Sequence, residues 1–238
     1  MNNILDLHTH SVLSKHAYSS TTENIDEAIK KGLKYLGLSE HQPDDVGVGA
    51  HIYGVNNGIT IPRHIENLTI LYGVECNLLN GGFIDDNKFK WDHFDYAICS
   101  IHGYVYKDEG FDGNTNNLLK ILDNKHVKIL GHLDRGHYAM DYDAVISKAK
   151  DKNVLIEINN ASLNKNKYNI ESASKTIGKI LETCLKYNEP VIINSDAHVK
   201  YEVGNYKESL ELIDLCHFPH EMVLNFNEEL FKSYFPMI

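Results

Sequence analysis

The stretch Ile4-Leu5-Asp6-Leu7-His8-Thr9-His10 is a short apolar run that ends in two histidines separated by one residue. Because residues i and i+2 of an extended strand point to the same side, His8 and His10 can direct two imidazoles at one point where the strand ends. Imidazole is the commonest neutral nitrogen ligand for zinc, manganese and iron. The pair alone is a weak signal, so its meaning depends on whether other segments send ligands to the same place.

Six further short apolar strands are predicted, and each ends in polar residues. They cover residues 35–38, 70–74, 96–100, 127–130, 154–158 and 190–194. Helices are predicted over 22–31, with Thr22 as the N-cap, from Pro62, over 118–122, from a cap at Asp141 or Asp143 to Lys152, and over 172–187, 206–215 and 228–234. This alternation of strands and helices is typical of a parallel sheet covered by helices.

The polar residues at the strand ends fall at positions 8, 41, 75, 102, 132, 159 and 196, at intervals of 27 to 37 residues. Each interval is about one βα unit. In a closed barrel all carboxyl ends of the strands meet on one face, whereas an open doubly wound sheet spreads them along a line. We therefore predict one α/β domain over residues 1–238, a distorted seven-stranded (β/α)7 barrel that resembles a TIM barrel.

The composition argues against several classes of protein. A net charge of −10 makes binding to long nucleic acids unfavourable. No apolar run is long enough to span a membrane, and no basic stretch followed by an apolar one opens the chain. Four widely spaced cysteines form no CxxC pair, so we expect reduced thiols in a cytoplasmic protein.

Potential metal ligands gather at the shared end of the predicted strands. They are His8, His10, His16, His41, Glu75, His102, His132, Asp196 and His198. Burying so many titratable groups together is costly unless a cation pairs with them. A catalytic zinc takes three protein ligands, so nine ligands suit three divalent ions with a shared carboxylate. Nitrogen-rich ligation favours zinc, with manganese or iron as alternatives, over magnesium or calcium.

Four motifs resemble those of the PHP family, the polymerase and histidinol phosphatase superfamily. They are Asp6-Leu7-His8-Thr9-His10, Ser39-Glu40-His41, Gly73-Val74-Glu75 and Ser195-Asp196-Ala197-His198. His102 and His132 match the two single-histidine positions between them, and His16 matches a further ligand. Glu40 departs from the family pattern, where an aspartate usually stands. The compact length and the segment Glu157-Ile158-Asn159-Asn160 resemble the short stand-alone phosphatase branch.

The resemblance implies that the whole chain is one metal-dependent phosphoesterase domain with a trinuclear site. One metal would take His8, His10, Glu75 and Asp196. A second would take Glu75, His102 and His132, with Glu75 as the bridging ligand, and a third His16, His41 and His198. The family also implies hydrolysis of phosphate monoesters. We hypothesise that a hydroxide bridging two metals attacks phosphorus in line, while the metals neutralise the equatorial oxygens.

Arg63 and Arg135 are the only arginines, and both lie in segments that follow strand ends. Since arginine grips phosphate oxygens in bidentate fashion, we predict that both bind substrate, with a surface ion pair as the alternative for each. Arg63 also matches a proline-arginine position of the phosphatase branch. His51 and His137 lie in the same loops and are further candidates for substrate binding, where either could protonate the leaving oxygen. The alternative for both is a position behind the ligands or at the surface.

Other functions stay open on the sequence alone. An amidohydrolase-type barrel also opens with an HxH pair, but it usually has eight strands and a longer chain. A phosphodiesterase or oligonucleotide nuclease could use the same site, and so could a metal-binding protein without activity. The expected partner is a small phosphorylated metabolite, with histidinol phosphate as a specific candidate, and the sequence indicates no oligomeric state.

Overall fold

The computed structural model describes residues 2–43, 47–85, 87, 89–135, 137–164, 166 and 168–236. Seven parallel strands are neighbours in the order β1-β2-β4-β5-β6-β7-β8, and β3 pairs antiparallel with β4. The strands are β1 (Leu5–Asp6), β2 (Tyr35–His41), β3 (His64–Ile65), β4 (Leu68–Asn77), β5 (Tyr96–Ser100), β6 (Val127–Gly131), β7 (Leu155–Asn159) and β8 (Val191–Asn194).

The sheet nearly closes on itself between β1 and β8. Thr9 and Ala197 form a parallel bridge beyond the two strand ends, and the His10 N–H donates to the Ala197 carbonyl at 2.9 Å. The Leu7 N–H donates to the side-chain oxygen of Asn194 at 2.8 Å. The predicted seven-stranded barrel is therefore confirmed.

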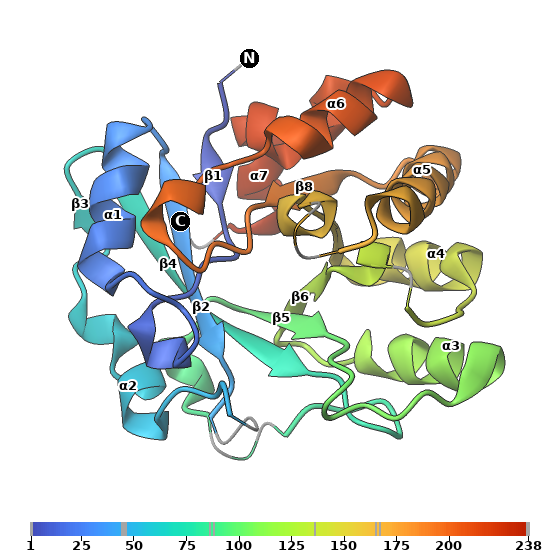
Figure 1. Ribbon diagram of the computed structural model, residues 1–238, viewed down its shortest axis with the longest axis horizontal. Helices are drawn as coiled ribbons and strands as arrows, with labels where there is room; N and C mark the ends of the chain where they lie inside the picture. Colours follow the sequence, from blue (N-terminus) through green and yellow to red (C-terminus); the bar gives the residue numbers. More distant parts are fainter. Residues whose placement is uncertain are drawn as a thin grey trace.

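Helices surround the strands in Figure 1, with α1 and α2 on one side and α3, α4 and α5 on the other. They are α1 (Thr21–Lys30), α2 (Ile52–Asn56), α3 (Gly110–Ile121), α4 (Tyr142–Lys152), α5 (Ile170–Tyr187), α6 (Lys207–Leu215) and α7 (Glu228–Tyr234). Among the described residues, an α-helix lies in each connection between consecutive parallel strands except that from β4 to β5, which contains only the short 3-10 helix Trp91–His93. Because the seven strands are parallel, the loops that follow them gather at one end of the barrel.

The barrel interior is apolar toward the amino ends of the strands. All seven parallel strands contribute to one buried apolar cluster. In this cluster the strand residues pack against Phe231 and Phe235 near the C-terminus. These strand residues are Leu5, Leu7, Tyr35, Leu71, Tyr96, Ile98, Ile129, Leu155 and Ile192. The helix α7 thus covers this end of the barrel with aromatic side chains.

Two glycines make room for the buried ring of Tyr96 inside the barrel. A Cβ on Gly37 would lie 2.0 Å from Tyr96 Oη, and a Cβ on Gly73 would lie 2.3 Å from the ring. Tyr96 Oη donates to the Leu7 carbonyl at 2.5 Å. Glu75 lies two residues beyond Gly73 and therefore points to the same side of β4, one step nearer the carboxyl end.

Two predicted helix starts were wrong. The N-cap of α1 is Ser20 rather than Thr22, because Ser20 and Glu23 form a reciprocal capping box. Pro62 opens no helix, since His64 and Ile65 pair with β4 as the first arm of a hairpin. Of the two candidate caps for α4, the structure selects Asp141, which accepts from two backbone N–H groups.

The helix α3 begins eight residues earlier than the predicted segment 118–122, at Gly110. Its first half is rich in Gly, Asp and Asn, which have low helix propensity. Tertiary contacts compensate: the Asn114 amide bonds Asp108 at 2.7 Å, and the Asn117 amide bonds Tyr106 at 2.9 Å. A prediction from the residues of the helix alone cannot include contacts of this kind.

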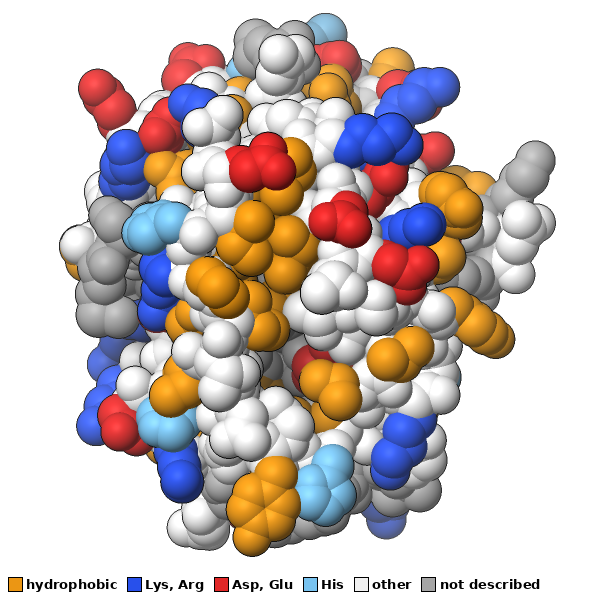
Figure 2. Space-filling model, turned by 90° about the vertical axis from the view of Figure 1, so that its left-hand side faces the viewer, with side chains coloured by type: hydrophobic (Ala, Val, Ile, Leu, Met, Phe, Trp, Pro, Cys, Tyr) orange, Lys and Arg blue, Asp and Glu red, His pale blue; other side chains and the backbone are white. Residues whose placement is uncertain are grey.

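None of the described helices is long and apolar enough to cross a membrane. Figure 2 shows the face that carries α1 and α2, where hydrophobic side chains gather in the middle and several acidic side chains lie above and to the right of them. Apolar atoms make up more than half of a typical protein surface, so this gathering carries no functional argument by itself.

Candidate metal centre

The Glu75 carboxylate lies at the middle of a buried cluster at the carboxyl ends of the strands. Ring nitrogens of five histidines lie within 3.5 Å of its oxygens. The distances are 3.4 Å for His8, 3.5 Å for His10, 2.9 Å for His41, 3.4 Å for His102 and 3.0 Å for His132. Five histidines from four separate segments of the chain thus converge on one carboxylate.

The remaining predicted ligands complete the cluster. Asp196 Oδ1 lies 3.2 Å from His10 Nε2 and 3.7 Å from His8 Nε2. His16 and His198 face each other with 2.7 Å between their Nε2 atoms, and the His198 ring lies 4.6 Å from that of His10. The structure therefore brings all nine predicted side chains together.

Several of these histidines are held through Nδ1. His8 Nδ1 lies 2.8 Å from Glu157 Oε1, and His102 Nδ1 lies 2.5 Å from Asn77 Oδ1. His16 and His198 bond the carbonyls of Ser14 and Asp196 through Nδ1, at 2.7 and 2.9 Å. Since these oxygens only accept, the proton must be on Nδ1, and the Nε2 lone pair is left for a metal.

The spacing of the donor atoms fits a divalent cation. Metal–ligand bonds of about 2.0–2.1 Å in a tetrahedron place the donor atoms about 3.3–3.4 Å apart. The pairs formed by His8 or His10 with Glu75 or Asp196 are 3.2–3.7 Å apart. His8 Nε2 and Glu75 Oε2 are buried and make no hydrogen bond within the described part of the chain. A cation between these donors would satisfy both.

The electrostatics favour the protonation states that bind metals. Burial lowers the pKa of His102 to about 3, and it also depresses the pKa values of His10 and His132. Burial would raise the pKa of Glu75, but the surrounding histidines, His8 first, hold it well below its ordinary value. Neutral imidazoles and ionised carboxylates are the forms that coordinate a metal.

His8 behaves differently from the other histidines. Burial lowers its pKa, but the nearby carboxylates of Glu157, Glu75 and Asp196 together outweigh burial, and the pKa is raised well above its ordinary value. The same three negative charges that retain a proton on His8 would attract a metal ion, which binds in competition with that proton.

Glu157 is a site residue that the sequence analysis noted only as part of a motif. Its carboxylate is fully buried and accepts from His8 Nδ1, from the His132 N–H at 2.8 Å and from the amides of Asn159 and Asn194 at 2.9 Å. Glu157 therefore orients two candidate ligands at once. The signal was present in the sequence, since a carboxylate interrupts the apolar run of β7.

Glu40 anchors the loop that carries His16. Its carboxylate accepts from the Ser11 N–H at 3.0 Å and from the hydroxyls of Ser11 and Ser14 at 2.5 Å. Ser14 Oγ accepts in turn from the His41 N–H at 3.0 Å, while the Ser14 carbonyl holds His16 Nδ1. The glutamate at this position thus positions two histidines of the cluster.

Two of the candidate ligands have unusual backbone conformations. His132 has φ 32° and Asp196 has φ 51°, in the left-handed region that non-glycine residues seldom adopt. Such conformations persist where the surrounding structure imposes them, and they cluster at functional sites. Both residues lie just beyond strand ends, where the chain must turn sharply to direct the side chain inward.

The two arginines lie in different places. Arg135 Nη2 donates to Asp196 Oδ2 at 2.7 Å, and its guanidinium stacks on the Tyr168 ring at 4.6 Å. Arg63 lies at the opposite end of β4, where it donates to the Ile70 carbonyl at 3.0 Å and to Asp95 at 2.5 Å. The structure therefore places Arg135 in the cluster and contradicts the prediction that Arg63 binds substrate there.

His137 and His51 both lie at the surface. His137 lines a small cavity together with His132 and Arg135. His51 caps α2 by accepting from the Tyr53 N–H, and its ring stacks on Tyr53 at 5.5 Å. Of these two predicted residues, the structure brings only His137 into a cavity shared with the cluster.

Comparisons with known proteins agree with this geometry. Residues 6–214 match the model of the PHP domain. A probable phosphatase of Clostridium acetobutylicum is 38% identical over 235 residues, which cover 98% of this chain and 95% of the relative. A probable phosphatase of Clostridium botulinum is 34% identical over 230 residues, or 96% of this chain and 92% of the relative.

Solved structures share the fold. A histidinol phosphate phosphatase of Lactococcus lactis, complexed with zinc, L-histidinol and phosphate, superposes with a TM-score of 0.59 at 16% identity, covering 91% of this chain and 95% of that chain. A chain of archaeal ribonuclease P with mature tRNA gives a TM-score of 0.60 at 18% identity, covering 97% of this chain and 89% of that chain. The family match and the close relatives decide between the barrel families considered from the sequence: the chain belongs to the PHP family, as one of its phosphatases.

Proposed function

We propose that this phosphatase hydrolyses small phosphate monoesters with three divalent ions held around Glu75. The observation that carries the proposal is a cluster of nine buried or partly buried ligand side chains, in which five histidines surround the Glu75 carboxylate. Among the described residues, His8 Nε2 and Glu75 Oε2 lack hydrogen bonds. Zinc is the first candidate and manganese or iron the alternatives, since the donors are mostly imidazoles.

The distances support three ligand sets, two of which share Glu75. His8, His10, Glu75 and Asp196 would hold one ion; Glu75, His102 and His132 would hold a second. His16, His41 and His198 would hold a third. Glu75 would bridge the first two ions, because Oε2 faces His8 and His10 while Oε1 faces His102 and His132.

Bound divalent ions would supply an activated water for attack on phosphorus and positive charge for the phosphoryl oxygens. The chain adds Arg135 as a phosphate-binding residue. Its Nη2 is anchored on Asp196, whereas its buried Nε makes no hydrogen bond within the described chain. A guanidinium held this way on one side presents its remaining donors to a phosphoryl group.

The leaving oxygen must receive a proton when the P–O bond breaks. His137 is the better placed of the two histidines predicted for this role, because it shares a cavity with His132 and Arg135. A protonated imidazole within reach of the leaving oxygen can act as the general acid.

The test combines metal analysis with phosphate release. We expect about three equivalents of divalent metal per chain and turnover of p-nitrophenyl phosphate. Glu75→Gln keeps the shape of the side chain but removes its charge, so metal content and turnover should both fall at least tenfold. His64→Ala, at an exposed histidine remote from the cluster, is the matched control and should change neither.

Two results would contradict the proposal. Wild-type metal content and turnover in the folded Glu75→Gln variant would remove the bridging role. A preference for bis(p-nitrophenyl) phosphate over the monoester would instead indicate a phosphodiesterase. Phosphate release from a set of metabolites that includes histidinol phosphate then ranks the substrates.

A further inference from the structure

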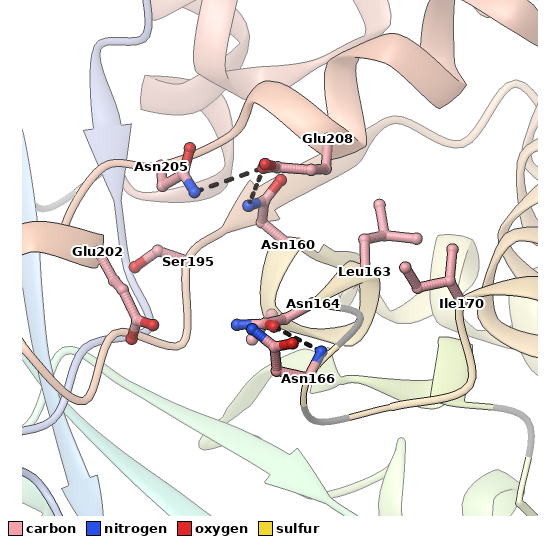
Figure 3. Close-up of a pocket in the computed structure, with 10 residues that line it drawn as sticks. Asn160, Leu163, Asn164, Asn166, Ile170, Ser195, Glu202, Asn205 and Glu208 are labelled. Carbon is pink, nitrogen blue, oxygen red and sulfur yellow. Dashed lines mark hydrogen bonds between the residues drawn. The ribbon is translucent and has the colours of Figure 1, made fainter.

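A second cavity adjoins the metal centre between the loops that follow β7 and β8 (Figure 3). Ser195 and Glu202 line one side, and Leu163 and Ile170 lie across from them. Asn160, Asn205 and Glu208 lie together at a third side. The cavity therefore combines an apolar wall with carboxylate and amide groups.

The cavity and the metal centre share a wall. Ser195 directly precedes the candidate ligand Asp196, and Glu202 Oε2 accepts from the N–H of the candidate ligand His198 at 3.3 Å. A phosphoryl group held at the cluster could thus place its ester substituent in this cavity. Carboxyl ends of the last strands of a barrel are a usual position for substrate groups.

Glu208 provides the negative charge on the side of the cavity that Asn160 and Asn205 also line. Its Oε2 accepts from the Asn160 amide at 2.9 Å and from the Asn205 amide at 3.4 Å. Both bonds use Oε2, and the described part of the chain makes no hydrogen bond to Oε1, so Oε1 is available to a ligand. The backbone N–H of Ser209 fixes Asn160 through its Oδ1 at 2.9 Å, so the amide is oriented before any ligand binds.

We propose that this cavity binds the alcohol part of the substrate and selects leaving groups that carry hydrogen-bond donors, either hydroxyls or an amine. The inference rests on the proposed monoesterase function. An ionised carboxylate only accepts hydrogen bonds, so Glu202 and Glu208 favour donors. The same charges disfavour a leaving group with a carboxylate or a second phosphate, because like charges brought together destabilise the complex.

Four phosphate monoesters of similar size test the proposal on the metal-loaded enzyme. They are glycerol 1-phosphate, 2-aminoethyl phosphate, n-propyl phosphate and 3-phosphoglycerate. We expect the lowest KM values for the first two and the highest for 3-phosphoglycerate. The comparison of the first two shows whether hydroxyls or an amine are preferred.

Substitution of Glu208 tests binding in the cavity separately from the chemical step at the metal centre. Glu208→Ala should raise KM for glycerol 1-phosphate and 2-aminoethyl phosphate about three- to tenfold, with kcat and metal content unchanged. The KM for n-propyl phosphate should stay constant. Glu208→Lys should also lower the KM for 3-phosphoglycerate. Glu211→Ala, an exposed glutamate on the same helix that does not line the cavity, should change none of these values.

Isothermal titration calorimetry with the same esters measures their affinity for the protein independently of turnover. If no monoester is hydrolysed but their binding depends on Glu208 as above, the proposed function fails and the cavity assignment stands. If monoesters are hydrolysed while Glu208→Ala changes all four KM values equally, or none, the cavity assignment is overturned.

Discussion

Arg63 and Arg135 lie at opposite ends of the barrel and differ in how their guanidinium donors are used. Arg63 lies at the amino end of β4, where Asp95, the Ile70 carbonyl and the Tyr72 ring at 4.3 Å surround it. Arg135 lies at the carboxyl end, where it bonds Asp196 and keeps a buried Nε without a hydrogen bond among the described residues. The two bonds of Arg63 Nη1 join parts of the barrel to each other and mark a structural contact, whereas a buried donor without a partner marks a place for a ligand.

The largest expected effect comes from exchanging these two arginines for alanine in turn. Arg135→Ala should lower kcat/KM for a phosphomonoester about 100-fold, because a preorganised donor to the phosphoryl group is lost. Arg63→Ala should leave kcat/KM unchanged and lower Tm by about 2–4 °C, since it removes a contact that joins β4 to the start of β5. Steady-state kinetics and thermal unfolding on both variants measure the difference.

A folded Arg63→Ala variant that loses as much activity as Arg135→Ala would show that the two arginines do not differ in function. Arg135→Lys separates charge from geometry, because lysine keeps the charge but not the planar fork. A kcat/KM of Arg135→Lys between those of wild type and Arg135→Ala would show that the geometry of the guanidinium as well as its charge contributes to phosphate binding.

A smaller effect is expected for the residues that hold the ligands at the carboxyl end. Ser14→Ala removes the hydroxyl that links Glu40 to the His41 N–H. We expect about tenfold weaker retention of one ion in chelator competition, because residues that orient metal ligands typically contribute that much. Ser20→Ala is the matched control: it removes the N-cap of α1 and should lower Tm without changing metal retention. Equal metal retention in both variants would remove Ser14 from the positioning network.

The strand ends could be predicted because the carboxyl ends of parallel strands must meet in a barrel, whichever loops connect them. A histidine or carboxylate at such a position therefore has a predictable location. His8, Glu75 and Asp196 meet for this reason, although they are separated by more than 60 residues in the chain.

The two arginines could not be told apart in the same way. Both follow a strand end in sequence, and the difference depends on partners such as Asp95, which lies 32 residues from Arg63. The turn at Pro62 returns the chain to the amino end of β4 as β3, so Arg63 leaves the site. Likewise, Glu157 is within β7 rather than after it, and only the packed barrel shows that it reaches His8.

The smallest effect on turnover is expected for Glu189, which contrasts with Glu75. Both carboxyl groups are buried, Glu75 at the carboxyl end of β4 and Glu189 just before the amino end of β8. Imidazoles surround Glu75, whereas the polar groups that the described residues bring to the Glu189 carboxylate are Lys150 Nζ at 3.9 Å and the Tyr234 hydroxyl at 3.4 Å. Burial therefore raises the pKa of Glu189 from 4.5 to about 7.

The raised pKa fixes the sign of a pH effect on stability. The folded state retains the Glu189 proton between about pH 4.5 and 7 while the unfolded state releases it, so stability falls as pH rises through this range. A shift of this size corresponds to at most about 3 kcal/mol above pH 7. Glu189→Gln carries no charge at any pH, so its Tm should exceed that of wild type by several degrees at pH 8 and by much less at pH 5, with turnover unchanged. A Tm difference independent of pH would show that Glu189 is already ionised in the folded protein at pH 5, and the contrast between the two buried glutamates would then depend on packing rather than on charge.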